Sequence, residues 1–298
     1  MNAPIALFAY NRPAHLRQTI DALLKNELAS ESDLVVFSDA PKNSDARENV
    51  DEVRNYLHEI EGFKSVRIIE RRENIGLAGS IIDGVQMLCH EYGKVIVLED
   101  DMETSPGFLR FMNDALTLYE QSERVISIHG YVYPVEGPLP ETFFLKGADC
   151  WGWATWARGW EIFEKDGRAL LREIEARKLE KRFDFNGAYG YTRMLREQVA
   201  GKNSSWAVRW YASAFLKDKL TLYPGRSLVR NIGNDDSGTH SVSTDIFDTD
   251  VETNYVSVES IPIVEDEAAL HEVEKFLRRT RGPILERLAK RIRSRLPI

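Results

Sequence analysis

Three consecutive carboxylates, Glu99, Asp100 and Asp101, directly follow an aliphatic run in the stretch KVIVLEDD at 94–101. A short apolar run of this kind predicts a buried strand, and uncompensated charge at its end is costly. Because open α/β sheets bind ligands beyond the carboxyl ends of their strands, we expect a cation there. Strand alternation places Glu99 and Asp101 on one side and Asp100 on the other, which suits Mn²⁺ or Mg²⁺ shared with a diphosphate. A solvated acidic turn is the alternative.

Two other apolar runs also end in polar side chains. FAYNRP, at 8–13, reaches Arg12, and VVFSDAPKN, at 35–43, reaches Asp39. If these strands are parallel, their ends share one crevice with the carboxylates. Arg12 could then bind a phosphate, and Asp39 could accept hydrogen bonds from a base or a ribose. Either residue could equally belong to an ordinary loop.

ENIGLAGSI, at 73–81, predicts a turn before a helix and contains Asn74 and Gly76. It matches neither the P-loop nor the dinucleotide fingerprint, although backbone amides there could approach a phosphate. His240 lies in the polar loop NDDSGTH. A lone histidine is more often structural, but here it could complete a metal site begun by Asp101, because manganese accepts nitrogen and oxygen ligands.

A tryptophan-rich segment, CWGWATW, begins at residue 150. Its rings could simply pack in a core. Trp151 and Trp153 flank Gly152, however, and aromatic rings beside a glycine can form a platform for the apolar face of a sugar. Asp149, which precedes the segment, could act as a general base.

The elements that must position these residues alternate between strand and helix, which predicts a mostly parallel α/β sheet flanked by helices. Expected strands are Ile5–Tyr10, Leu34–Ser38, Val66–Glu70, Val95–Leu98, Val125–Ile128 and 220–223, and expected helices are 13–25, 45–60, 77–91, 107–121, 168–181 and 187–200. Because no polar linker interrupts the chain, we expect one domain at 1–262, with a nucleotide-binding half to about 130 and an acceptor half from 131. A helical C-terminal extension, 263–298, should follow.

Composition narrows the class of protein. The 298 residues carry a net charge of −8, which argues against nucleic acid as a partner. Two cysteines are too few for a disulfide framework or a cysteine zinc site. The chain shows no signal-like start and no apolar stretch of roughly 18 residues, so we expect a cytoplasmic protein. The basic amphipathic segment 283–298 could rest on an anionic membrane surface or dock on its own domain.

Taken in order, FAYNRP, FSDAPKN, ENIGLAGS, VLEDDMETSPGFLRF and WGWATW resemble GT-A-fold glycosyltransferases. They are most similar to N-acetylglucosaminyltransferase-I-like and bacterial family-2-like enzymes, over about residues 3–240. The resemblance implies a Rossmann-like GT-A fold, a nucleotide-diphosphate sugar donor, a divalent metal and inversion at the anomeric carbon. It also implies that Arg12 and Asp39 hold the nucleotide. Glu99, Asp100 and Asp101 match the acidic motif of the family, in which Glu99 and Asp100 would lie at the nucleotide and the last aspartate, Asp101, would bind the metal. The CWGWATW segment would form the acceptor and sugar loop, and the His240 loop would close over the diphosphate.

One segment departs from the pattern of these enzymes. They place an aspartate catalytic base in a W-D-x-x-W-like segment, whereas this chain has Ala207 between Trp206 and Trp210. Asp149 and Asp236 are the candidate bases; otherwise the alignment slips or transfer activity is lost.

The expected function is metal-dependent transfer of a hexosyl or N-acetylhexosaminyl group to a glycan or lipid-linked glycan, in surface polysaccharide synthesis. Two alternatives stay open at this point. A sugar-nucleotide nucleotidyltransferase would carry a Gly-rich loop after the first strand, which FAYNRPAHLR lacks. A non-catalytic carbohydrate-binding relative is supported only by Ala207.

Overall fold

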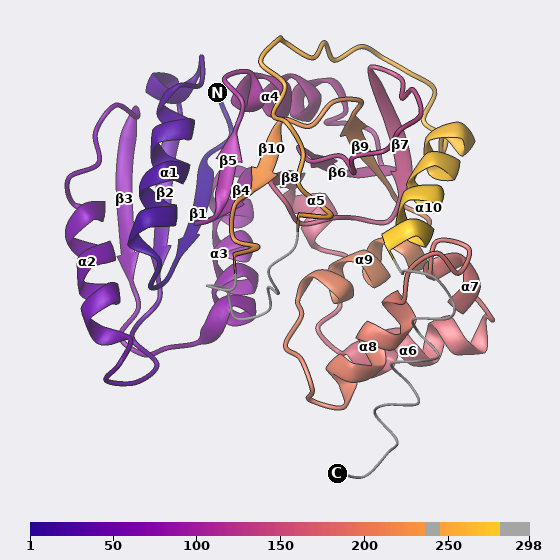
Figure 1. The fold of residues 1–298 in the computed structure, drawn as a ribbon, viewed down its shortest axis with the longest axis horizontal. Helices are drawn as coiled ribbons and strands as arrows, with labels where there is room; N and C mark the ends of the chain where they lie inside the picture. Colours follow the sequence, from indigo (N-terminus) through magenta and orange to yellow (C-terminus); the bar gives the residue numbers. More distant parts are fainter. Residues whose placement is uncertain (236–244, 281–298) are drawn as a thin grey trace.

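An eight-stranded, mostly parallel sheet forms the centre of the molecule (Figure 1). The computed structural model describes residues 1–235 and 245–280. The strands lie in the order β3-β2-β1-β4-β8-β6-β9-β7. Their bounds are β1 Ile5–Ala9, β2 Asp33–Ser38, β3 Ser65–Glu70, β4 Lys94–Glu99, β6 Val125–His129, β7 Thr142–Lys146, β8 Trp153–Trp156 and β9 Leu220–Pro224. A second, two-stranded sheet pairs β5 (Met102–Thr104) with β10 (Val229–Asn231). The predicted α/β class is confirmed.

All six strands that the sequence predicts are present, and each end differs from the expected one by at most one residue. The central strand β1 shows why apolar runs in the sequence predict these strands. It pairs in parallel with β2 on one side and with β4 on the other, placing Leu7 opposite Val36 and Leu98. Both faces of β1 are therefore buried, and a strand buried on both faces reads as a continuous apolar run.

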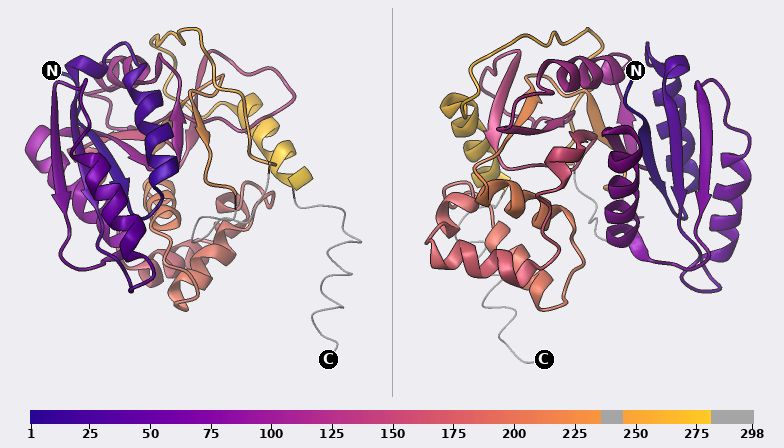
Figure 2. Two further views of the ribbon diagram at one scale, coloured as in Figure 1. Left: turned by 60° about the vertical axis from the view of Figure 1, so that its left-hand side comes forward. Right: turned by 180° about the vertical axis from the view of Figure 1, so that it is seen from behind.

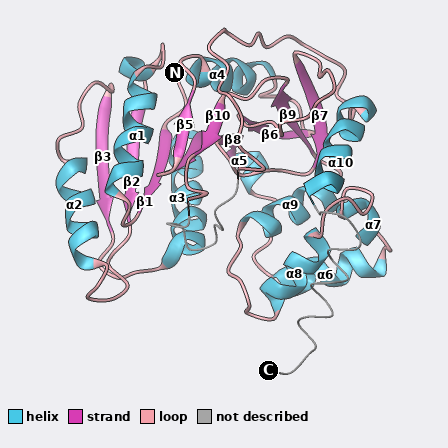
Figure 3. Ribbon diagram, in the orientation of Figure 1, coloured by secondary structure: helices cyan, strands magenta, loops and turns pink. Residues whose placement is uncertain are grey.

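Helices cover both faces of the sheet (Figure 3). The helices on one face are α1 (Pro13–Leu24), α2 (Arg47–Leu57) and α4 (Phe108–Leu118), which share one hydrophobic core. The helices on the other face include α3 (Gly76–Tyr92) and α5 (Ala157–Trp160), which pack in a second core together with the first turns of α9 (Ala207–Leu216). The four helices predicted between residues 13 and 121 are thus confirmed, with ends that shift by up to three residues.

A group of helices lies beside the second half of the sheet (Figure 2). It consists of α6 (Gly167–Ala176), α7 (Glu180–Phe183), α8 (Tyr191–Val199) and α9. The single helix expected at 168–181 is two helices, because Lys178 adopts a left-handed backbone conformation with φ of 56° and ends the first. In the C-terminal extension, α10 (Glu267–Thr280) packs on the sheet near β7, and the predicted basic helix lies outside the described residues. No helix of residues 1–235 and 245–280 is long and apolar enough to cross a bilayer.

The strand order contains a topological switch point between β1 and β4. From β1 the chain adds β2 and then β3 on one side, and it returns to place β4 on the other side of β1. Loops that leave β1 and β4 therefore diverge at the carboxyl edge of the sheet, where open α/β sheets bind ligands. The residues that follow these two strands include Arg12, Asp100 and Asp101.

Candidate functional site

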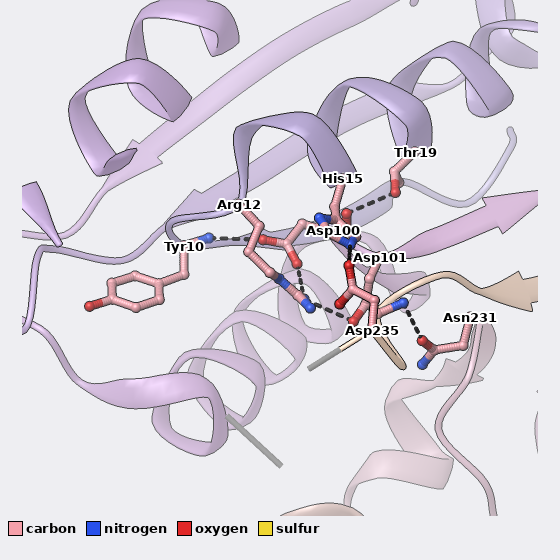
Figure 4. Close-up of polar contacts among 9 residues, drawn as sticks. Tyr10, Arg12, His15, Thr19, Asp100, Asp101, Asn231 and Asp235 are labelled. Carbon is pink, nitrogen blue, oxygen red and sulfur yellow. Dashed lines mark hydrogen bonds and ion pairs between the residues drawn. The ribbon is translucent and has the colours of Figure 1, made fainter. Parts of the chain in front are cut away.

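An ion-pair cluster occupies the switch point (Figure 4). Arg12 follows β1, and its Nη2 donates to Asp100 Oδ1 and lies 2.8 Å from Asp101 Oδ2. The expectation that Asp100 and Asp101 face opposite sides is wrong, because β4 ends at Glu99 and both aspartates lie in the following turn. Strand alternation no longer applies there, and one guanidinium reaches both carboxylates. Part of the positive charge expected beside this acidic run is therefore supplied by Arg12 of the chain itself.

Asp100 is held in place from two elements. Its Oδ2 accepts a hydrogen bond from the Tyr10 backbone N–H at 3.2 Å, and its carbonyl oxygen accepts one from Thr19 Oγ1 at 2.9 Å. Thr19 lies in α1 and is fully buried. Asp100 therefore joins β1, α1 and the acidic turn, and both of its carboxylate oxygens have partners within the chain.

Asp101 differs from Asp100 in the hydrogen bonding of one carboxylate oxygen. Its side chain is nearly buried, yet Oδ1 has no hydrogen-bond partner among the described residues. Buried polar atoms are almost always paired, so this carboxylate oxygen calls for a partner from outside the described residues, such as a water molecule or an ion. A hard divalent cation fits this donor. Within residues 1–235 and 245–280 no three His, Cys, Asp or Glu side chains cluster at metal-binding spacing. His240, the predicted second ligand, lies outside the described residues.

Burial and mutual repulsion shape the charges of this cluster. Desolvation, followed by the charges of Asp101 and Asp100, raises the pKa of Glu99 to about 8. Desolvation also raises the pKa of Asp100 to about 6, although Arg12 opposes that change. For Arg12 desolvation acts downward, but the two aspartates overcome it and raise its pKa above the ordinary value. The positive charge of one guanidinium does not balance the three carboxylates. The remaining negative charge favours the binding of a further cation.

The segment 231–235, which leaves β10, lies directly over the ion pairs (Figure 4). The Ile232 N–H donates to the Asp101 carbonyl oxygen at 2.9 Å. A Cβ atom added to Gly233 would lie 2.1 Å from Asp101 Oδ2 and 2.8 Å from Arg12 Nη1. His15 Nε2 of α1 lies 3.1 Å from Asp235 Oδ2. Sequence reasoning predicted that the loop NDDSGTH, which begins at residue 234, lies near Asp101, but it did not single out Gly233 or the pairing of His15 with Asp235.

The predicted nucleotide-binding residues beside β2 are brought together as well. Asp39 accepts hydrogen bonds from the backbone N–H groups of Ile75 at 3.1 Å and Gly76 at 2.8 Å. Asn74 Nδ2 donates to the Ala40 carbonyl oxygen at 2.7 Å. Asp39 thus ties the end of β2 to the start of α3, where Gly76 adopts φ of 71°. Their role in binding a base or ribose stays a prediction.

Asp149 lies at the same edge of the sheet, in the segment that leads into β8. Its Oδ2 accepts a hydrogen bond from Tyr133 Oη at 3.2 Å, and its Oδ1 accepts one from the Cys150 N–H at 2.9 Å. Burial, followed by the charges of Asp149 and Glu99, raises the pKa of the Cys150 thiol well above its ordinary value, and Asp101 adds to this shift. Asp149 is therefore a carboxylate oriented by two hydrogen bonds. It and the acidic cluster both act electrostatically on the Cys150 thiol, which places Asp149 near that cluster. The other candidate base, Asp236, lies outside the described residues.

The two tryptophans expected to form a sugar platform lie in different places. Trp151 is partly exposed and packs edge-on against Tyr131, with ring centroids 4.7 Å apart. Trp153 is fully buried and stacks on Trp206 at 5.5 Å. The expectation for Trp153 is therefore wrong. Gly152 adopts φ of 59°, which breaks the extended backbone between the two rings and turns Trp153 into the core.

Replacing Trp153 with alanine is expected to lower the free energy of unfolding by about 3–5 kcal/mol, the usual cost of emptying a buried aromatic site. Urea denaturation followed by circular dichroism measures this loss. Trp151→Ala is the control, and we expect a smaller loss because its ring is partly exposed. A loss below about 1 kcal/mol for Trp153→Ala would contradict its placement in the core.

Comparison with known proteins identifies the first part of the chain. Residues 5–128 match the model of a family described as Glycosyl transferase family 2. This segment contains the strands on both sides of the switch point, together with Arg12, Asp39 and the three carboxylates. For this part of the chain the predicted resemblance to glycosyltransferases is confirmed. The specific resemblance to N-acetylglucosaminyltransferase-I-like enzymes stays a prediction.

Two solved structures are similar to parts of the chain. The mannosyltransferase PcManGT from Pyrobaculum calidifontis, in complex with GDP-Man and Mn²⁺, is 14% identical with a TM-score of 0.34, over 44% of this chain and 35% of its own. Residues 1–349 of TarS from S. aureus are 11% identical with a TM-score of 0.42, over 79% of this chain and 62% of theirs. The chain thus spans less than two thirds of either protein. No curated protein matches the sequence.

Proposed function

We propose that the protein is an inverting, metal-dependent glycosyltransferase. It transfers a hexosyl or N-acetylhexosaminyl group from a nucleotide-diphosphate sugar to a hydroxyl of a glycan or lipid-linked glycan, in surface polysaccharide synthesis. The observation that carries the proposal is the cluster at the switch point. Arg12 pairs with Asp100 and Asp101 there, and Asp101 Oδ1 is left without a partner among the described residues. The family match at residues 5–128 covers this cluster.

The donor binds along the carboxyl edge of β1, β2 and β4 in this proposal. Asp39, with Asn74 and Gly76, contacts the base and ribose, while Arg12 offers guanidinium donors to the diphosphate. Asp101 would hold Mn²⁺ or Mg²⁺, with His240 as a second ligand. A cation held there would supply positive charge against the charge that develops on the leaving nucleoside diphosphate.

Asp149 is the proposed general base. The acceptor hydroxyl oxygen attacks the anomeric carbon from the face opposite the diphosphate, and its proton passes to the Asp149 carboxylate. The bond from that carbon to the diphosphate oxygen breaks, and its electron pair leaves with the diphosphate. Tyr133 and the Cys150 N–H orient the carboxylate for this step. Trp151 and Gly152 follow Asp149 within three residues of the chain and line the acceptor side.

For the cellular setting we propose the cytoplasm, with peripheral contact between segment 283–298 and an anionic membrane. The support is the spacing of Ile284, Leu288, Ile292 and Leu296 among basic residues, which suits an interfacial helix. A lipid-linked acceptor would be presented at that surface.

A panel of nucleoside diphosphates and nucleotide sugars, each with and without Mn²⁺, tests the proposal by thermal shift. We expect one nucleotide to raise the melting temperature in a Mn²⁺-dependent way, because a ligand at about 100 times its Kd stabilises the folded state by about 2.7 kcal/mol. Its sugar conjugate should be consumed when oligosaccharide acceptors are added. A well-folded protein that responds to no nucleotide would contradict the proposal.

A further inference from the structure

The positive charge nearest to Asp101 in this structure belongs to Arg12, although Asp101 is the residue proposed to hold the metal. Arg12 Nη2 lies 2.8 Å from Asp101 Oδ2, and Oδ1 of the same carboxylate has no partner in the described part of the chain. The Asp101 side chain is about nine-tenths buried, and so a cation that binds Oδ1 would repel the guanidinium held at Oδ2 of the same desolvated carboxylate.

We propose that Arg12 is the resident counter-cation of Asp101 and that a divalent cation displaces it. Arg12 then keeps its pairing with Asp100 and turns its released N–H donors to the diphosphate of the donor. Metal binding and diphosphate binding are thereby coupled through one side chain. This inference rests on the proposed glycosyl transfer and adds the regulation of that same site.

The two aspartates hold Arg12 with unequal strength, which decides which contact is given up. Asp100 is fixed by the Tyr10 N–H and by Thr19, and Arg12 completes its set of partners. Leaving Asp100 would strand a carboxylate that is 3% exposed, and an unpaired buried charge is costly. A cation that replaces the guanidinium at Asp101 leaves no such orphan. The Asp101 contact is therefore the one that breaks.

The segment 231–235, which lies over the ion pairs, limits how the Arg12 guanidinium can move. Gly233 packs so closely that an added Cβ would lie 2.8 Å from Arg12 Nη1, and so the guanidinium is confined between this backbone and the aspartates. Asn231 Oδ1 accepts the Gly233 N–H at 2.8 Å and fixes the turn. When Arg12 moves away from Asp101, it shifts along this backbone, and its released N–H donors become available to the diphosphate.

Two binding measurements follow from the competition. Without nucleotide, removal of Arg12 should tighten Mn²⁺ binding, because the competing cation is gone. With nucleotide, Mn²⁺ should strengthen nucleoside diphosphate binding in the wild type and do so much less without Arg12. Coupling between two ligands is reciprocal, so each effect can be measured from either side.

The experiment compares the wild type with Arg12→Gln by electron paramagnetic resonance of free Mn²⁺ and by calorimetry with UDP and GDP. We expect Mn²⁺ to bind about tenfold tighter to Arg12→Gln, a difference of about 1.4 kcal/mol. The Mn²⁺-induced gain in nucleotide affinity should fall at least about fivefold. Arg17→Gln is the matched control, because Arg17 lies in α1, the helix that begins directly after Arg12, and pairs with Glu52 at the surface. It should leave both affinities unchanged.

Arg12→Lys keeps the charge without the forked donors and provides a second variant if Arg12→Gln does not fold. Its Mn²⁺ affinity should stay within about threefold of the wild type, while the coupling to nucleotide falls. Unchanged or weaker Mn²⁺ binding in Arg12→Gln overturns the inference, as does a tenfold change in Arg12→Lys. A wild type that binds nucleotide without any Mn²⁺ effect overturns the inference but leaves glycosyl transfer standing. A wild type that binds neither ligand overturns both.

Discussion

Asp101→Asn is expected to reduce glycosyl transfer by about a thousandfold, which is the scale of losing a group that stabilises transition-state charge. Asparagine has almost the same shape as aspartate, so the turn and the Asp101 carbonyl bond to the Ile232 N–H should persist. The lost quantity is the negative charge that holds the cation. The measurements are the transfer rate with saturating donor and Mn²⁺ binding by electron paramagnetic resonance.

Asp101→Asn should still fold, so that a lower rate of glycosyl transfer can be assigned to the lost charge. In the wild type Asp101 Oδ1 is a buried oxygen that no described residue satisfies, and so replacing a buried carboxylate by a neutral isostere removes a desolvated charge. Arg12 keeps Asp100 as its partner. We expect the melting temperature to change little. Asp51→Asn, an exposed aspartate of α2, is the control and should be fully active. Transfer within tenfold of the wild type in Asp101→Asn would rule out the metal role of Asp101.

The strands around the switch point could be predicted because their apolar sequence runs match their burial on both faces of the sheet. Runs such as IALFA and KVIVLE are apolar because both of their faces are covered, and their parallel pairing places their ends together without further information. Arg12, Asp39 and the carboxylates could be assigned to one edge on that basis. The side on which each carboxylate lies could not be predicted, because it depends on where β4 stops, and the chain turns directly after Glu99.

The other differences arise from backbone conformation and from distant pairing. The two tryptophans of WGW would share a side in an extended strand, but the left-handed conformation of Gly152 separates them. Gly233 and Asp235 reach the site only because β10 pairs with β5 next to Asp101. The partners His15 and Asp235 are 220 residues apart in the chain, and no spacing pattern in one sequence reports such a contact.

Asp149→Asn is expected to lower the transfer rate by about 10²–10⁴-fold, the range supplied by a positioned general base. Asparagine can still accept a hydrogen bond from Tyr133, so the segment before β8 should keep its place. Donor and Mn²⁺ binding should be unchanged, because among the described residues the Asp149 carboxylate accepts its hydrogen bonds from Tyr133 and Cys150 rather than from the Arg12 cluster. A loss of rate with intact donor binding therefore separates the base from the donor site.

Tyr133→Phe is the matched variant, since it removes one hydrogen bond to Asp149 and leaves the carboxylate in place. Its rate should fall by no more than about tenfold, because one oriented hydrogen bond contributes about 1 kcal/mol. The size of the two losses separates the roles, because Asp149→Asn removes the base whereas Tyr133→Phe only alters its surroundings. If Asp149→Asn keeps the wild-type rate, the proton is taken by another group, and Asp236 is the next residue to replace.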